Sequence, residues 1–595
     1  MIRYVIDASS TASHTFAVAL TIARPSREQR LSLPVWIPGS YLVREFARHL
    51  SALVAEQDGR PVPLEQIDKA SWLARCVGEG ELVVRYRVYA FDVSVRAAFL
   101  DADRGFFNGT SLCLRVEGRE GEAHRLAVTG VASGWQVATA LAAQPGDTPY
   151  EFVAPDYEEL VDHPVELGRF WRGAFTAGGV AHELVVAGAL PDFDAETLLA
   201  DTKRICEAEI AFWHGPEGRA PFDRYLFLLN AVDEGRGGLE HRSSTALVSP
   251  RRDLPRRAAA APAVASTPVA AGTRAEPSEG YVSVLGLIAH EYFHAWNVKR
   301  LKPRDFARLD YSRENYTRLL WFFEGFTSYY DDLLLRRGGV IDSGHYLRLL
   351  AKTMTAVAAM PGREVQSVAA ASFDAWVKYY RGDENTPNAT VSYYTKGSLV
   401  ALAFDLTLRS ERRGSLDDVM RRLWATSDGG PVDEADIAAA LEAVGGRSYA
   451  AELAAWVHGT GELPLAGLLP RFGVSVERQP ATLAQRLGVR VSESALTGVK
   501  VTHVLRGGAG ERIGLSAGDE LIGVGGWRLR RLDEALRFLA PTGATPLLVA
   551  RDQRLLGLSF DTDGLAGDES GAVQLRRAES ASAEARALGD AWTSG

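Results

Sequence analysis

Short stretches of alternating apolar and polar residues fill the first part of the chain. Runs such as "TFAVALTIA" and "LVVRYRVYA" place apolar residues at about every second position, which is the period of a β-strand with one buried face. Segments rich in turn-forming residues, such as "PGS", "QDGRP" and "GEGE", separate these runs. The pattern predicts an antiparallel β domain over residues 1–164, whose edge loops could line a substrate groove.

The pattern changes after residue 165. "HELVVAGAL" and "RYLFLLNAV" indicate strands on either side of the helical stretch "DAETLLADTKRICEAEIAFWHG", so we expect a mixed α/β domain over residues 165–385. Within it, residues 251–280 are rich in Ala, Pro and Arg without useful periodicity, which predicts a flexible surface loop. Apolar residues then recur at helical spacing from 281 to about 458, and residues 386–468 are expected to form a helical subdomain.

Glycine turns and short strands return near residue 470. The stretch "AGERIGLSAGDELIGVGG" resembles the sequence pattern of bacterial PDZ domains, which predicts a PDZ domain over residues 469–565. Residues 566–595 are mostly polar and small, so we expect a loosely held polar tail.

Composition narrows the function classes. The chain has 595 residues, 66 basic and 75 acidic, and its formal net charge of −9 gives no reason to expect a nucleic acid or an anionic membrane as partner. Three widely separated cysteines encode neither a disulfide framework nor a cysteine metal site. The chain shows no signal-peptide pattern at its start and no apolar run of about 18 residues, so the expected location is the cytoplasm.

The stretch "VLGLIAHEYFHAWNVKR" carries the clearest chemistry. His290 and His294 are four residues apart, and on a helix both can direct a ring nitrogen at one metal ion. Glu291 lies one position further round, where its carboxylate can act as the general base that takes a proton from water. With 12 histidines in the chain, this pattern would arise by chance on the order of 0.02 times. We therefore predict one Zn²⁺ ion per chain.

A catalytic zinc site needs a third protein ligand. A metzincin would have Gly at 297 and His at 300, and this chain has Asn297 and Arg300, which excludes that class. Glu324 is the preferred ligand because it lies inside the apolar helical pattern "RLLWFFEGFTSYY", where an unpaired carboxylate would be costly to bury. Glu314 is the rival ligand.

Taken together, "HEYFHAWNVKR", "ENYTRLLWFFEGFTSYYDDLLL", "PVWIPGSYLVREF" and the PDZ-like segment resemble the glycyl aminopeptidase family of gluzincin zinc metallopeptidases. The resemblance covers nearly the whole chain. It implies a multidomain α+β fold in which the N-terminal β domain is followed by a thermolysin-like catalytic domain with a helical subdomain, and then by the PDZ domain. It also implies a peptide substrate with a free N-terminus, whose first residue is small, glycine or alanine.

Two more sites follow from the resemblance. In gluzincin aminopeptidases the Glu of a G-x-M-E-N strand holds the substrate's α-amine, and "GGLEH" aligns Gly237, Gly238 and Glu240 with that strand. Leu for Met and His241 for Asn are departures from the pattern, which puts the last polar partner in doubt. A Y-x-K-G segment, here starting at Tyr394, supplies the tyrosine that stabilises the oxyanion.

Two other functions remain open at this stage. The chain could be an endopeptidase that uses its PDZ domain to capture chain ends, or a catalytically silent peptide-binding protein. The presence of all presumed catalytic residues argues against the silent protein, and cleavage of N-acetylated peptides would identify an endopeptidase. The sequence leaves open the PDZ ligand, which is expected to be a peptide or a protein.

Overall fold

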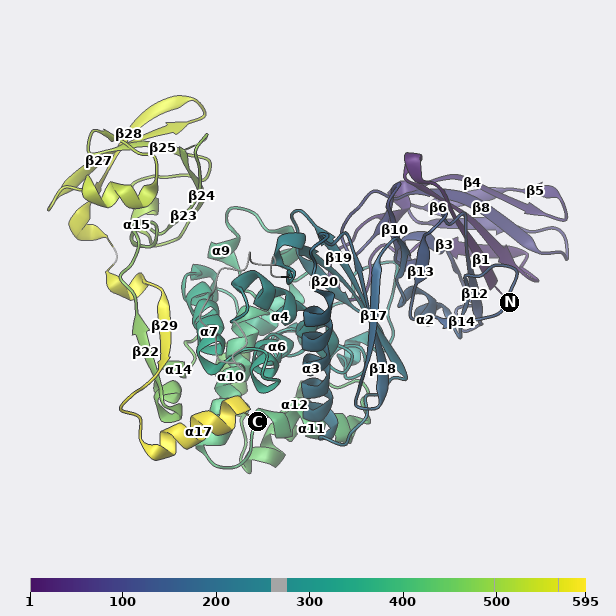
Figure 1. Ribbon diagram of the computed structural model, residues 1–595. Coiled ribbons are helices and arrows are strands. Elements are labelled where there is room, and N and C mark those ends of the chain that lie inside the picture. The colour runs from purple at the N-terminus through teal and green to yellow at the C-terminus, as the bar shows by residue number, and fades with distance from the viewer. Residues whose placement is uncertain (1, 258–275, 497, 566, 595) are drawn as a thin grey trace, which may run out of the picture. The chain divides into compact units, whose positions relative to one another are not determined.

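The computed structural model describes residues 2–257, 276–496, 498–565 and 567–594 (Figure 1). The chain forms two compact units. The first comprises Met1–Tyr316, Gly338–Ile341 and Trp424–Pro431, and the second comprises Thr317–Arg337, Asp342–Leu423 and Val432–Gly595. Among the described residues, no helix is both long enough and apolar enough to cross a membrane.

The first unit begins with three β-sheets that share one apolar core. The regular alternation of buried and less buried residues in β1 and β8 is the feature that the sequence pattern predicted. One pairing differs from the expected antiparallel arrangement, because β1 and β12 are parallel. Parallel neighbours need a long crossover, and more than 100 residues separate these two strands. The largest sheet has the order β14 (Ala142–Ala143), β15 (Glu151–Ala154), β12 (His124–Thr129), β1 (Ile2–Ser10), β2 (Thr15–Ile22), β8 (Leu82–Tyr89), β4 (Leu50–Gln57) and β5 (Arg60–Val62).

Two smaller sheets and two short helices complete this β-rich part. One sheet has the order β13 (Gln136–Ala138), β16 (Val165–Gly168), β10 (Arg104–Phe107) and β9 (Ala98–Leu100). The other has the order β11 (Arg115–Val116), β3 (Glu28–Ser32), β7 (Ser71–Arg75) and β6 (Leu64–Asp68). The helices are α1 (Gly109–Leu112) and α2 (Tyr157–Val161).

A five-stranded sheet follows, and it positions the residues of interest. Its central strands are parallel, and β20 joins the edge antiparallel to β21. Two long helices, α3 and α4, pack beside it and against each other (Figure 1). The strands and helices are β17 (Trp171–Ala177), β18 (Val180–Ala187), β19 (Arg224–Val232), β21 (Ser244–Pro250), β20 (Gly237–Glu240), α3 (Ala195–His214) and α4 (Glu279–Phe293). Most of the predicted flexible loop, residues 258–275, lies outside the described residues.

Helices dominate the chain from residue 320 to 468. The apolar pattern around Glu324 predicted one continuous helix, but the structure has two, α5 and α6, separated by Glu324–Phe326. Gly325 is the cause, because its backbone lies against the backbone of Gly397 and no larger residue fits there. The helices are α5 (Leu320–Phe323), α6 (Thr327–Arg337), α7 (Ser343–Ala358), α8 (Val368–Phe373), α9 (Thr386–Ala389), α10 (Thr395–Ser410), α11 (Leu416–Ser427), α12 (Glu434–Gly445), α13 (Ala450–Glu452) and α14 (Leu465–Leu468).

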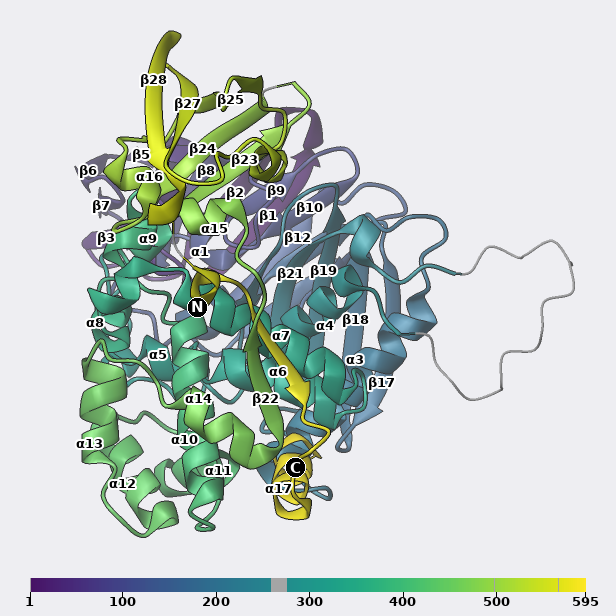
Figure 2. The same cartoon turned by 90° about the vertical axis from the view of Figure 1, so that its left-hand side faces the viewer.

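The PDZ segment is a separate β structure with its own core. Its elements are α15 (Leu483–Leu487), β23 (Val489–Ser494), β24 (Gly498–Val504), α16 (Ala509–Arg512), β25 (Glu520–Val524), β26 (Trp527–Arg528), β27 (Ala544–Arg551) and β28 (Arg554–Asp561). Two paired strands flank it, β22 (Val474–Arg478) and β29 (Val573–Arg577), which run side by side in Figure 2.

The expectation of a loosely held C-terminal tail is wrong. β29 belongs to a strand pair, and the last helix, α17 (Ala583–Ser594), buries Trp592 completely. A single tryptophan in a short polar stretch supplies the apolar surface that holds this segment. One apolar residue does not make a periodic pattern, so the sequence did not predict a packed helix here.

Candidate metal centre and active site

Helix α4 carries the two histidines to its C-terminal end. The helix begins after Ser278, whose side chain accepts a hydrogen bond from the Tyr281 backbone N–H at 3.2 Å. It ends at Phe293, and His294 is the capping residue, still in helical conformation. His290 and His294 therefore keep the one-turn relation that their spacing predicted, and their Nε2 atoms lie 3.1 Å apart.

A backbone carbonyl fixes the orientation of the His294 ring. Its Nδ1 lies 2.7 Å from the backbone carbonyl oxygen of Asn297. A carbonyl only accepts, so Nδ1 carries the proton and Nε2 presents its lone pair on the opposite side. This is the tautomer that a metal-binding histidine requires.

Glu324 completes a group that fits a metal ion. Ligand atoms of His290, His294 and Glu324 all lie within 4.8 Å of one another. Two nitrogen ligands of a tetrahedral zinc ion are about 3.3 Å apart, close to the separation of the two Nε2 atoms. Glu324 is 2 % exposed, and a metal would compensate the charge of such a buried carboxylate. Among the described residues, this group contains Glu324 and not Glu314.

Glu291 lies on the side of α4 that faces strand β20. Its side chain is buried, and its carboxylate packs directly on the backbone of Gly238. A methyl group at position 238 would overlap the carboxylate, so only glycine allows this approach. The sequence predicted a substrate-binding role for Gly238. The structure adds that this glycine makes room for the Glu291 carboxylate.

Strand β20 presents Gly238 and Glu240 on one face and Leu239 on the other. Leu239 is fully buried in the core shared with the N-terminal sheets, which holds the strand in this register. Residues two apart on a strand point the same way, so Glu240 shares the face on which Gly238 meets Glu291. Glu240 is 4 % exposed. The strand pairs with β21 on one side, and the Arg96 guanidinium donates to the Gly238 carbonyl at 3.4 Å.

Gly39 is a contact that sequence reasoning missed. It lies against the flat face of the Glu240 carboxylate, where any Cβ would overlap it, and its φ of +87° also favours glycine. The residue belongs to "PVWIPGSYLVREF", a stretch that contributed to the family resemblance without an assigned role. About 200 residues of sequence separate the two partners, so no local pattern links them.

His241, the departure from the family pattern, belongs to a buried charged network. Its Nδ1 lies 3.2 Å from Asp162, which also accepts a hydrogen bond from Lys299 at 2.7 Å. Burial raises the pKa of Asp162, but Lys299 and His241 more than offset this and hold it well below its usual range. Burial lowers the pKa of His241, against the opposing effect of Asp162. A neutral histidine donating to a carboxylate thus stands where the family has an asparagine.

The turn after His294 is strained and is held by this network. Val298 has a φ of +126°, a region that β-branched residues rarely adopt. Its N–H donates to the Leu301 carbonyl at 2.8 Å, and the ion pair of Lys299 with Asp162 secures the next residue. The turn also contains Asn297, whose carbonyl orients His294. The network therefore supports the turn that orients the His294 ring.

Tyr394 lies at the start of α10, on the same unit as Glu324. Its side chain is half-buried, and its hydroxyl is 3.4 Å from that of Tyr380. Burial, and then the nearby Glu324 carboxylate, raise the pKa of Tyr394 well above its usual value. The phenol therefore stays protonated at neutral pH and can donate a hydrogen bond. Tyr393 is fully buried, and so are Trp296, Trp321 and Phe322, as expected for core residues.

Comparisons with known proteins identify the family. Residues 3–169 match the Peptidase M61 N-terminal domain, residues 283–400 match M61 glycyl aminopeptidase, and residues 475–550 match the PDZ domain. A crystal structure of an aminopeptidase N family protein from Idiomarina loihiensis is 35% identical, with a TM-score of 0.89, and the match covers 100% of both chains. The chain belongs to the M61 glycyl aminopeptidase family. It is thus a metallopeptidase, and the predicted family and fold class are confirmed.

The chain is also similar, more distantly, to M1 peptidases. An M1 zinc metallopeptidase from Deinococcus radiodurans is 15% identical, with a TM-score of 0.45, over 78% of this chain and 94% of that chain. This likeness is too slight to carry an argument. No curated protein matches the chain. In this M61 peptidase the His-His-Glu group is of the kind typical of a zinc metallopeptidase.

Proposed function

We propose that this M61 peptidase is a zinc-dependent aminopeptidase that removes the N-terminal residue from peptides. The observation that supports this best is the arrangement on β20, where Glu240 shares a face with Gly238 and Gly238 lies against Glu291. Two residues along a strand span about 6.6–6.8 Å. A cation held at Glu240 would thus be about one substrate residue from a bond attacked beside Glu291, which is the register of an exopeptidase.

His290, His294 and Glu324 would hold one zinc ion. When bound, zinc would polarise the scissile carbonyl and make a water molecule acidic enough to react near neutral pH. Glu291 would accept the proton of the attacking water and pass it to the leaving amine. Tyr394 would donate a hydrogen bond to the oxygen that becomes negatively charged.

The substrate would bind along β20. The edge of this strand that does not pair with β21 would offer the backbone N–H groups of Gly238 and Glu240 to an extended peptide, as in other complexes that add a strand to a sheet, while Gly237 lies at the start of the strand. The α-ammonium group would pair with Glu240 in a charge-assisted hydrogen bond. The family resemblance favours glycine or alanine as the first residue. A peptide or protein ligand of the PDZ domain, the cytoplasmic location and domain boundaries at residues 164, 385 and 468 remain predictions.

We expect Glu240→Gln to impair chiefly the hydrolysis of peptides with a free N-terminus. The amide keeps the shape of the side chain against Gly39 but loses the charge that pairs with ammonium. Losing a charge-assisted hydrogen bond of about 1.5–3 kcal/mol lowers kcat/KM roughly 10- to 150-fold. The measurement compares free and N-acetylated forms of one peptide, and the acetylated form, a poor substrate, should change little.

The matched control for this test is Glu234→Gln. Glu234 lies in the loop before β20 and forms an exposed ion pair with Arg252, so its loss should leave both substrates unaffected. Equal losses on the free and acetylated peptides in Glu240→Gln would show that Glu240 supports the site without reading the N-terminus. Efficient cleavage of acetylated peptides by the unmodified protein would instead identify an endopeptidase.

We expect Glu324→Ala to lower the zinc affinity by at least about 100-fold. Even residues that only hydrogen-bond to a metal ligand raise metal affinity or activity by 10- to 100-fold, and Glu324 would bind the metal directly. Glu314→Ala is the control, since Glu314 lies ten residues earlier in the sequence and outside the His-His-Glu group. Metal content after dialysis against a chelator, measured by mass spectrometry, separates the two variants. Equal zinc retention would mean that the third ligand is another residue.

A further inference from the structure

The edge of β20 that does not pair with β21 carries the positive charge of Arg96. The Thr245 hydroxyl of β21 donates to the Leu239 carbonyl at 3.0 Å, so the Gly238 carbonyl points to the opposite edge of the strand. There it accepts the hydrogen bond from the Arg96 Nη2 atom at 3.4 Å. The Nη1 atom lies beside Gly237, where an added Cβ would be 3.4 Å from it. The guanidinium therefore lies at the Gly237 end of the edge that is proposed to bind the peptide.

The main chain around Arg96 is held in place by a buried amide. The side-chain amide of Asn108 donates to the carbonyls of both neighbours of Arg96, to Val95 at 2.8 Å and to Ala97 at 3.2 Å. The Arg96 backbone N–H donates to the Ser94 hydroxyl at 3.3 Å. Because these contacts fix the backbone on both sides of Arg96, the side chain starts from a position that is set before any ligand binds.

The charge of Arg96 is not neutralised within the part of the chain that the structure describes. The side chain is half-buried and forms no ion pair there, and its buried Nε has no hydrogen-bond partner. Other partly buried cations of this unit are paired, as Arg104 is with Glu166 and Lys299 is with Asp162, both at 2.7 Å. A charge removed from water needs a partner, and the planar fork of a guanidinium matches a carboxylate best.

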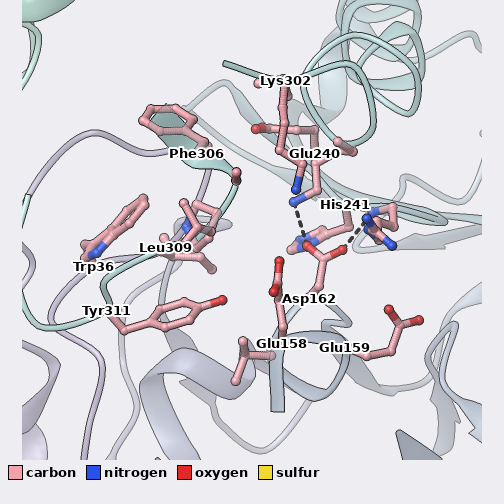
Figure 3. A pocket seen from close by; sticks show the side chains of 18 of the residues that line it. Trp36, Glu158, Glu159, Asp162, Glu240, His241, Lys302, Phe306, Leu309 and Tyr311 are labelled. Atoms are coloured by element: carbon pink, nitrogen blue, oxygen red, sulfur yellow. Dashed lines mark hydrogen bonds and ion pairs between the residues drawn. The ribbon is translucent and has the colours of Figure 1, made fainter. Parts of the chain in front are cut away.

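The other end of β20 has the opposite charge. A cavity of about 260 Å³ opens beside Glu240, and Figure 3 shows Glu158, Glu159 and Asp162 around it. Carboxylates outnumber cations among the side chains that line this cavity. This end of the strand therefore favours an ammonium group and disfavours a carboxylate. A short peptide carries both charges, so it would bind with its ammonium group at Glu240 and its carboxylate toward Arg96.

The spacing along β20 matches a peptide of two residues. From Glu240 to Gly238 the strand advances by two residues, or about 6.6–6.8 Å. An extended dipeptide has about the same length, because each of its two residues also spans about 3.3–3.4 Å. With its ammonium group held at Glu240, its carboxylate lies alongside Gly238, next to the nitrogens of Arg96. In a longer peptide an uncharged peptide group takes this position.

We infer that Arg96 binds the C-terminal carboxylate of the substrate, and that the preferred substrates are dipeptides. The inference rests on the proposed aminopeptidase function and adds the substrate class to it. Arg96 transfers no proton and determines specificity by binding alone, since a guanidinium can donate two parallel hydrogen bonds to a carboxylate. Glycine or alanine as first residue is compatible with this role, because Arg96 would contact only the far end of the substrate.

The experiment measures kcat/KM of the full-length zinc-loaded protein for Ala-Ala, Ala-Ala amide and Ala-Ala-Ala. We expect Ala-Ala to be hydrolysed at least about 10-fold more efficiently than the other two, which place no carboxylate at Arg96. Arg96→Met should lower kcat/KM for Ala-Ala roughly 10- to 150-fold, mainly through a higher KM, and should change the amide little. Arg96→Lys keeps the charge and should recover part of this loss.

The matched control is Arg87→Met, at an exposed position of β8, which should change none of the three rates. Equal hydrolysis of Ala-Ala and its amide by the unmodified protein, or equal losses on both in Arg96→Met, would overturn the role of Arg96 and leave the aminopeptidase intact. Hydrolysis of Ala-Ala-Ala as efficient as that of Ala-Ala would overturn the dipeptide preference. If Arg96→Met fails to fold, the ratio of Ala-Ala to amide hydrolysis in Arg96→Lys and in the unmodified protein decides. Failure to hydrolyse any of the three peptides, which all have a free amine, would overturn the proposed function itself.

Discussion

We expect the Glu291→Gln variant to retain its zinc but to have a turnover number at least about 100-fold lower. General acid–base catalysis usually raises a reaction rate by a factor of about 10²–10⁴. The amide has the size of the carboxylate, so it fits against Gly238 without displacing β20. It cannot accept the proton of the attacking water, whereas both histidines and Glu324 remain to bind the metal. The measurement is kcat on a free-amine substrate together with metal content.

The control for this variant lies on the same helix. Glu279 is exposed in the first turn of α4, and Glu279→Gln should keep nearly full activity. A Glu291→Gln protein with more than half of the normal turnover would remove Glu291 from the role of base. Loss of zinc in that variant would show that the carboxylate supports the metal site instead.

The parts of this site that could be predicted are the local ones. The spacing of His290 and His294 fixes their relation within one helical turn, whatever the rest of the chain does. Family resemblance added Glu240 and Tyr394, and β20 and the start of α10 carry these residues. Neither spacing nor resemblance could reveal Gly39 on Glu240, because that contact joins two distant segments through backbone packing.

Single residues also decided where the fold departs from the predicted pattern. The apolar run around Glu324 predicted an unbroken helix, and the close approach of Gly325 and Gly397 interrupts it. This approach joins the segment that bears Glu324 to the segment that bears Tyr394. A pattern of apolar positions contains no information on such backbone contacts, because it describes which face is buried and not how closely another segment approaches.

The departure at His241 is explained by its surroundings. Histidine in place of asparagine, directly after the glutamate predicted to bind the amine, put the last polar partner of the pattern in doubt from sequence alone. In the structure this histidine donates to Asp162 Oδ1, the same carboxylate oxygen that accepts a hydrogen bond from Lys299. The change is thus accommodated by a buried network, and the strand that carries Glu240 keeps its pairing with β21.

The C-terminal segment gives the second large expected effect, on stability. Trp592 of α17 is fully buried, and its indole N–H donates to the Tyr329 hydroxyl at 2.9 Å. That hydroxyl donates to Asp405 at 2.6 Å, and the Arg337 guanidinium donates to the Trp592 carbonyl at 3.1 Å. Tyr329 lies in α6, the helix that begins three residues after Glu324. The end of the chain thus secures the helix next to the predicted zinc ligand.

We therefore expect truncation after residue 578, which removes α17, to lower the free energy of unfolding by at least about 3–5 kcal/mol, the usual cost of removing a buried tryptophan. Excision of residues 480–571 should have little effect, because Arg478 and Val573 are paired neighbours and a short glycine turn can join the strands. Thermal melting of the two proteins and hydrolysis of a short aminoacyl substrate provide the comparison. If the excised protein is folded but inactive, the PDZ domain takes part in the active site. If truncation leaves the melting temperature unchanged, α17 does not stabilise α6.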